Sequence, residues 1–161
     1  MASATDKTPA AGPAGEIRER ILAEHDRLRR LIGAIRSVAD LIGEGDEELG
    51  DSLRVMLVAL FRKLKNHMRY EDETLAPLLR DLDAFGEVRV EAFAREHEDQ
   101  RQQMTEILQT ATNHHADGRE VAERAIAISE RVLNDIEHEE ATFLHPDVLR
   151  DDIIVADTET G

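Results

Sequence analysis

The fold is decided by residues 53–78, which read LRVMLVALFRKLKNHMRYEDETLAPL. Apolar side chains recur there at steps of three and four: Leu53, Leu57, Leu60, Phe61, Leu64, Leu75 and Leu78. This spacing places them on one face of an α-helix, and no strand-like alternation competes with it. Pro77 falls near the end of the run, and a connector follows at 81–86. The pattern therefore predicts an amphipathic helix of about 25 residues.

Three further stretches, 17–42, 90–111 and 121–143, show the same spacing of apolar residues. Glycines follow the first of them, and Pro146 closes the last. Short connectors favour antiparallel neighbours. The sequence therefore predicts an all-α protein, an up-down-up-down four-helix bundle.

The two ends of the chain differ in composition from the helical part. Residues 1–15 are small and polar and contain prolines and glycines, so we expect a disordered leader. The bundle then spans 16–146, and residues 147–161 form a C-terminal tail. The tail contains the apolar run 153–155 (Ile-Ile-Val), which we expect to fold back on the bundle.

The composition excludes several classes of function. The 35 acidic and 20 basic residues give a net charge of −15, which repels phosphate backbones and disfavours nucleic acid. The absence of cysteine excludes disulfides, zinc ribbons, iron–sulfur clusters and thiol nucleophiles. No apolar run approaches the roughly 20 residues of a membrane span, and the N-terminus lacks a secretory apolar region. We expect a soluble, cytoplasmic domain without a membrane partner, either a monomer or a small homo-oligomer.

Polar side chains on the apolar faces are informative, because burial without a partner is costly. All four predicted helices contribute candidates: His25, His67, Glu71, His97, Glu139 and Glu140. Unpaired carboxylates in an apolar core are strongly disfavoured, whereas a bound cation would satisfy them together. Imidazole and carboxylate without thiolate suit iron or manganese and leave zinc open. The pattern therefore predicts a metal site in the bundle core.

The other four histidines have ordinary interpretations. His138 lies about 200° around the helical wheel from Ile136, so we expect it to point outward. His114 and His115 fall in a polar connector, where we expect them to be solvated. His145 precedes a proline at a helix end, where a cation interacts favourably with the helix dipole.

One combination of residues, spread over the four predicted helices, is more specific. It consists of His25, the string His67-Met-Arg-Tyr-Glu71-Asp72 with Leu75 and Pro77, His97 within Arg-Glu-His-Glu, and Glu139-Glu140 before Pro146. This combination resembles the hemerythrin-like, or HHE cation-binding, domain. The resemblance implies a bundle with a non-haem, oxo- or hydroxo-bridged di-iron centre. It also implies that His25, His67, Glu71 and His97 are iron ligands, that Glu71 bridges, and that Glu140 is the fourth-helix carboxylate.

Two positions depart from the family pattern. Ile136 stands where the fourth helix would carry a histidine, and Arg101 stands where some members have a second histidine in the third helix. Three alternatives follow. Glu24, Glu96 or Glu139 completes the ligand set, or the site holds one metal ion. Otherwise Arg101 pairs with Glu139 or its neighbour in an ion network without metal.

The resemblance implies a non-haem iron protein that binds or senses oxygen, peroxide or nitric oxide at a site with two iron ions, or one. The alternative is a metal-free interaction or scaffold module. A ferritin-like oxidase needs Glu-x-x-His on two helices, but Leu64 and Ala94 occupy the Glu positions before His67 and His97. No nucleophile elbow, phosphate loop or nucleotide fingerprint is present, so no enzymatic reaction is assigned.

Overall fold

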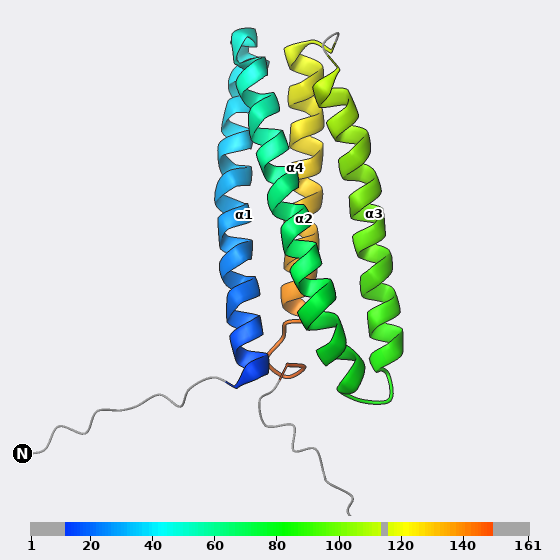
Figure 1. Cartoon of the computed structure of the whole chain (residues 1–161). Coiled ribbons are helices and arrows are strands. Elements are labelled where there is room, and N and C mark those ends of the chain that lie inside the picture. The colour runs from blue at the N-terminus through cyan, green and yellow to red at the C-terminus, as the bar shows by residue number, and fades with distance from the viewer. Residues whose placement is uncertain (1–11, 114–115, 150–161) are drawn as a thin grey trace, which may run out of the picture.

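The computed structural model describes residues 12–113 and 116–149, which form four long helices lying side by side (Figure 1). The elements are α1 (Pro13–Glu44), the short 3-10 helix η1 (Glu47–Leu49), α2 (Gly50–Asp81), α3 (Gly86–Thr112) and α4 (Gly118–Ala141). Successive long helices run in opposite directions, and the described residues contain no strand. The predicted up-down-up-down bundle is therefore confirmed.

The first helix begins earlier than the sequence pattern indicated. α1 starts at Pro13 rather than Glu16, and the Glu16 N–H donates to the Gly12 carbonyl at 2.9 Å. Proline is well suited to the first turn because its φ angle is already helical and its missing N–H has no partner to lose there. Residues 13–15 thus belong to α1 and not to a leader. The rest of the predicted leader and the 153–155 patch lie outside the described residues.

Two of the connecting turns depend on glycine. Gly45 ends α1 with a φ of 124°, and its N–H donates to the Ile42 carbonyl at 3.1 Å. A side chain is strained at such a φ angle. At Gly86, a Cβ atom would collide with the backbone of Arg80. Glycine thereby permits the close turn that reverses the chain between α2 and α3.

The buried apolar residues form two clusters at different levels of the bundle. The larger one includes Leu28 of α1, Leu64 and Met68 of α2, and Ile136 of α4. The smaller one is made of Ile21, Leu75, Leu79, Phe93, Phe143, Leu144 and Leu149. On each helix, the candidate ligands fall between residues of these two clusters. The fold therefore places a polar layer between two apolar layers.

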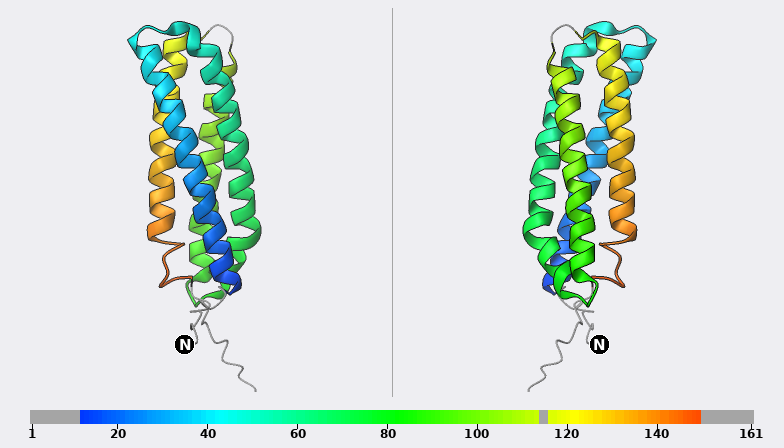
Figure 2. Two further views of the ribbon diagram at one scale, coloured as in Figure 1. Left: turned by 90° about the vertical axis from the view of Figure 1, so that its left-hand side faces the viewer. Right: turned by 90° about the vertical axis from the view of Figure 1, so that its right-hand side faces the viewer.

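The segment after α4 completes the smaller cluster. It continues past Ala141 toward the end of the bundle where α1 begins (Figure 2). Leu144 and Leu149 are buried there, and Arg18 of α1 donates to the Leu144 carbonyl at 2.7 Å. This segment therefore packs against α1 and closes the smaller apolar cluster. Among the described residues, no helix is long and apolar enough to cross a membrane.

Candidate metal centre

Four of the six predicted ligands converge in the polar layer. Each of four buried residues offers one ligand atom, and these four atoms all lie within 4.8 Å of one another. The residues are His25, His67, Glu71 and Glu139. They come from α1, α2 and α4, so the site exists only when these helices pack together. His67 and Glu71 are one helical turn apart, which puts both on the same face of α2.

Glu71 lies between the histidines of two helices. Its Oε1 atom is 3.3 Å from His67 Nε2, and its Oε2 atom is 3.3 Å from His97 Nε2. On the other side of the cluster, His25 Nε2 is 3.1 Å from His67 Nε2 and 3.3 Å from Glu139 Oε2. His97, from α3, thus joins the group through Glu71. Five of the six predicted ligands face one another.

A carboxylate holds the outward ring nitrogen of each of the three core histidines. The three contacts are His25 Nδ1 to Glu140 (2.9 Å), His67 Nδ1 to Glu24 (2.9 Å) and His97 Nδ1 to Asp72 (2.7 Å). Because an ionised carboxylate only accepts hydrogen bonds, we assign the ring proton to Nδ1 in each case. The Nε2 lone pairs then point inward, as in metal-binding histidines whose other nitrogen donates to a carboxylate.

An arginine in turn pairs with each of these carboxylates. The pairs are Arg29 with Glu140 (bidentate, both contacts 2.9 Å), Arg20 with Glu24 (3.3 Å) and Arg101 with Asp72. Hydrogen bonding from Arg29 lowers the pKa of Glu140. Hydrogen bonding from His67 lowers the pKa of Glu24. The result is three histidine–carboxylate–arginine triplets that orient the three rings. The hydrogen bonds in two of them favour the ionised forms of Glu140 and Glu24.

The centre of the cluster has polar atoms without partners. Both oxygens of Glu71 and the Nε2 atom of His97 are buried and accept no hydrogen bond from the described residues. Burial raises the pKa of Glu71 well above its ordinary value, and the nearby charge of Glu139 raises it further. With the ring protons on Nδ1, the Nε2 atoms of His25 and His67 turn lone pairs toward each other at 3.1 Å.

These observations test whether the residues fit a metal ion. Buried polar groups in native proteins are almost always satisfied, so several orphaned acceptors at one point require an explanation. Every inward atom of the cluster is a lone-pair donor of the kind that binds iron, manganese or zinc. A cation is the one partner that satisfies all of these atoms at once. The donor set fits a metal ion.

Glu140 takes a different place from the other predicted ligands. Its carboxylate lies behind His25 and pairs with Arg29, and its side chain is 28% exposed. The adjacent Glu139 faces inward instead and is buried. The two glutamates are about 100° apart around α4, so only one of them can face the cluster. Glu140 supports the ring of His25, whereas Glu139 supplies the inward oxygen.

The two positions that depart from the family pattern have separate explanations. Ile136 is 3% exposed and belongs to the larger apolar cluster. Arg101 does not pair with a glutamate of α4, as one alternative proposed, but with Asp72 and Glu98. Its guanidinium therefore supports His97 through Asp72. The roles of Asp72 and Arg29 were not predicted from the sequence, although Asp72 follows Glu71 directly within the quoted string.

The remaining histidines and Glu96 lie away from the cluster. His138 is 55% exposed, as predicted from the wheel, and it lies 3.6 Å from Glu96. Glu96 therefore does not complete the inward ligand set. His145 lies in the turn after α4, where its Nδ1 atom accepts from the Asp147 N–H at 3.2 Å. His114 and His115 lie outside the described residues.

Comparison with known families agrees with this geometry. The model of the hemerythrin HHE cation binding domain matches residues 16–145, which is most of the chain. The protein therefore belongs to the hemerythrin HHE cation-binding family, and the resemblance inferred from the sequence is confirmed. Separate searches of curated proteins and of solved structures found no match. Membership of this family indicates that the function is binding of a metal cation.

Proposed function

We propose that this protein binds iron in the polar layer of its bundle and presents it to a small ligand, namely oxygen, peroxide or nitric oxide. The observation that carries the proposal is the set of orphaned acceptors on Glu71 and His97, which lie beside the inward nitrogens of His25 and His67. Histidine and carboxylate donors without cysteine favour iron over softer metals. Family membership supports the binding of a cation.

In this proposal the inward residues divide into two groups. His25, His67, Glu71 and Glu139 hold one ion, because their ligand atoms gather within 4.8 Å. The second group consists of His97 and the other oxygen of Glu71, and it would hold a second ion. The second group has fewer protein donors than the first. We therefore propose a centre for two iron ions, in which the ion at His97 is held more weakly and the first ion alone is the lower limit.

When bound, iron would supply an open coordination position for the small ligand. The chain itself supplies orientation and exclusion of water. The three histidine–carboxylate–arginine triplets fix the rings with Nε2 inward. The two apolar clusters on either side of the layer exclude water along the axis of the bundle. Donors held in a dry, shaped cavity are what a protein contributes to a metal centre.

Iron content of the full-length protein tests the proposal. After anaerobic loading and desalting, we expect about two iron ions per chain, or about one if only the first group binds tightly. His67→Ala removes a donor of the first group and should lose that iron. His138→Ala is the matched control, because His138 is exposed and lies outside the cluster. Unchanged iron in His67→Ala, or no iron in the wild type, would contradict the proposal.

Optical spectroscopy then tests the small ligand. Nitric oxide or oxygen added to the ferrous protein should produce a new absorption band that is absent without the gas and absent in His67→Ala. A wild-type spectrum that neither gas changes would limit the function to iron binding. A chain with no iron and with unfolding unaffected by chelator would support the metal-free scaffold alternative instead.

A further inference from the structure

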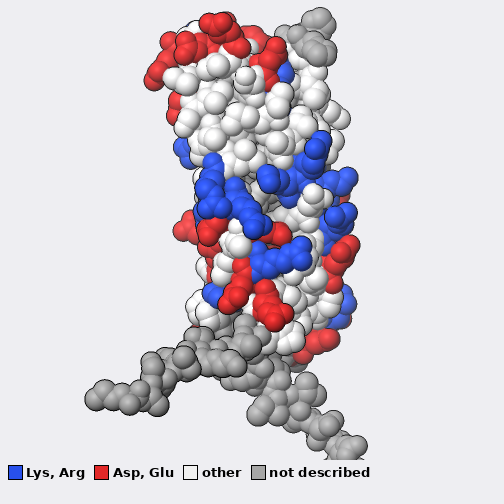
Figure 3. Space-filling view, turned by 60° about the vertical axis from the view of Figure 1, so that its left-hand side comes forward, with Lys and Arg blue, Asp and Glu red and all other residues white. Residues whose placement is uncertain are grey.

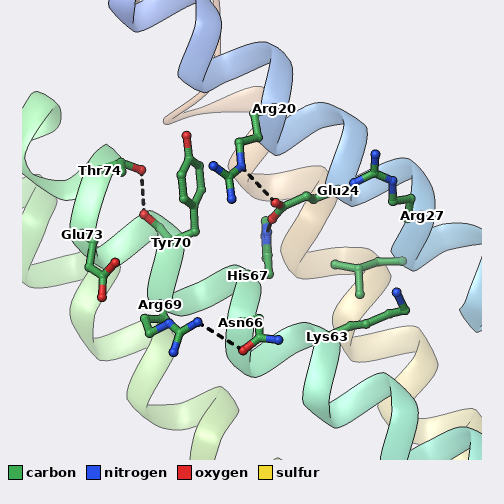
Figure 4. A pocket seen from close by; sticks show the side chains of 11 residues that line it. Arg20, Glu24, Arg27, Lys63, Asn66, His67, Arg69, Tyr70, Glu73 and Thr74 are labelled. Carbon is green, nitrogen blue, oxygen red and sulfur yellow. Dashed lines mark hydrogen bonds and ion pairs between the residues drawn. The ribbon is translucent and has the colours of Figure 1, made fainter.

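A pocket of about 610 Å³ opens between α1 and α2 (Figure 4). Its charged lining residues are Arg20, Arg27, Lys63, Arg69, Glu24 and Glu73. Four of these residues are cationic and two are acidic, although the chain as a whole carries a charge of −15. The pocket therefore has the opposite sign of charge to the protein. Its volume lies within the usual range for small-molecule sites.

Three of the cations in the pocket remain available to a ligand. Arg20 is engaged, because it pairs with Glu24 and lies over the Tyr70 ring at 3.6 Å from the centroid. Arg27 and Lys63, in contrast, make no ion pair with any residue in the described part of the chain. Within the described residues, the one side-chain contact of Arg69 is a 3.5 Å hydrogen bond to the Asn66 side chain. Arg27, Lys63 and Arg69 thus bring three cations without a carboxylate partner into one pocket of an acidic protein.

The surface around the pocket limits the size of the ligand. Lysine and arginine gather about halfway along this side of the molecule, and acidic residues lie on both sides of them along its length (Figure 3). Fields of exposed charges decay over about 8 Å at physiological ionic strength. A short anion would therefore be influenced mainly by the pocket, where four cations outnumber two acids, whereas a long polyanion would extend over the acidic surface. A small ligand with two closely spaced negative charges matches this pattern.

We propose that the α1–α2 pocket binds a small divalent oxyanion, a phosphate or a dicarboxylate, between Arg27, Lys63 and Arg69. Guanidinium groups bind such oxygens in bidentate fashion, and an ammonium group adds a compact charge. The pocket lies beside the proposed iron centre, because His67 and Glu24 form part of its wall (Figure 4). The anion site itself does not depend on iron, since its cations belong to the metal-free chain.

The test is isothermal titration of the full-length, metal-free protein with inorganic phosphate at low salt, with succinate titrated in parallel. We expect one site, weakened by added sodium chloride because the interaction is charge-driven. Lys63→Gln or Arg27→Gln should each weaken binding about fivefold, and the double variant about twentyfold. Both residues are exposed, so the fold should tolerate these changes. Whichever anion binds more tightly identifies the ligand as phosphate or dicarboxylate.

Two further variants serve as controls. Arg124→Gln removes the same charge from an exposed position on α4, away from the pocket, and should leave the affinity unchanged. Glu139→Gln alters a proposed iron donor that does not line the pocket, so anion binding should survive even where iron binding fails. Equal weakening by Arg124→Gln would show general charge attraction and overturn the proposal. Absence of heat with both anions would also overturn it.

Discussion

Glu71→Gln separates the stability of the empty bundle from its affinity for metal. Glu71 is completely buried, its oxygens accept no hydrogen bond from the described residues, and burial raises the pKa of its carboxyl. Glutamine keeps the shape but carries no charge. Its amide nitrogen can donate to the Nε2 atom of His67 or His97, each of which is 3.3 Å from an oxygen of Glu71.

The substitution should therefore stabilise the metal-free protein. Glutamine satisfies one buried acceptor and removes an unpartnered carboxyl. Because leaving such groups unsatisfied costs a similar amount, we expect the free energy of unfolding to rise by about 1–2 kcal/mol. For a chain of this size, that free energy corresponds to a rise of about 2–8 °C in the melting temperature. Glu73→Gln is the control, because Glu73 is exposed, and it should change stability by less than about 0.5 kcal/mol.

With iron present, the order of stability should reverse. A metal ion at a hundred times its dissociation constant stabilises the folded state by about 2.7 kcal/mol. Glutamine lacks the negative charge of a carboxylate ligand, so the variant should lose most of this gain while the wild type keeps it. The wild type should then unfold at the higher temperature. The sign of the difference, and not only its size, is the diagnostic quantity.

Thermal unfolding followed by circular dichroism, in chelator and in ferrous iron under anaerobic conditions, measures both effects on the same samples. Iron analysis of the desalted protein provides an independent readout. A Glu71→Gln variant that is less stable than the wild type in chelator would refute the interpretation of Glu71 as an unpartnered buried group. A variant that retains full iron content would refute its assignment as a ligand.

Two other substitutions test the surroundings of the site. Arg29→Gln removes the guanidinium that holds Glu140 against His25, so iron affinity measured by chelator competition should fall about tenfold. Arg30→Gln is exposed and should not change the affinity; equal losses would assign the effect to net charge. Asp135 of α4 accepts a hydrogen bond from the Gln100 side chain of α3, and burial raises the pKa of its carboxyl. The folded state therefore binds this proton more tightly than the unfolded state, and the stabilising effect is lost as pH rises through the folded pKa. Asp135→Asn should therefore be more stable than the wild type at pH 7, by up to about 1 kcal/mol, with the difference shrinking toward pH 4 in denaturant unfolding. A difference that grows as the pH falls would contradict this sign.

Much of the fold and part of the site were predictable from local patterns. The spacing of apolar residues repeats every three to four positions, so the helical faces follow from the chain geometry alone. The same rule placed His67 and Glu71 on the buried face of α2, where the structure has them. The start of α1 was placed three residues too late, because the small residues after Pro13 carry no periodic signal, although they continue the helix.

The choice between Glu139 and Glu140 was not predictable in the same way. Both residues flank the apolar face of α4, and a small rotation of that helix decides which of them points inward. The rotation is set by packing against α1, where Arg29 captures Glu140 from 111 positions away in the sequence. The partner of Arg101 is another such case, because Asp72 belongs to a different helix.

Four amphipathic helices, the absence of thiol ligands, and histidines and glutamates on the buried faces all follow from the amino-acid sequence. Those properties are local, since they depend on composition and on the pitch of a helix. The packing of the helices sets which nitrogens and oxygens meet, which carboxylates lie behind the rings, and where Arg27, Lys63 and Arg69 share a pocket. These contacts join residues that are distant in the chain. They depend on how whole helices rotate and pack against one another, and the spacing of apolar residues within one helix does not specify that rotation.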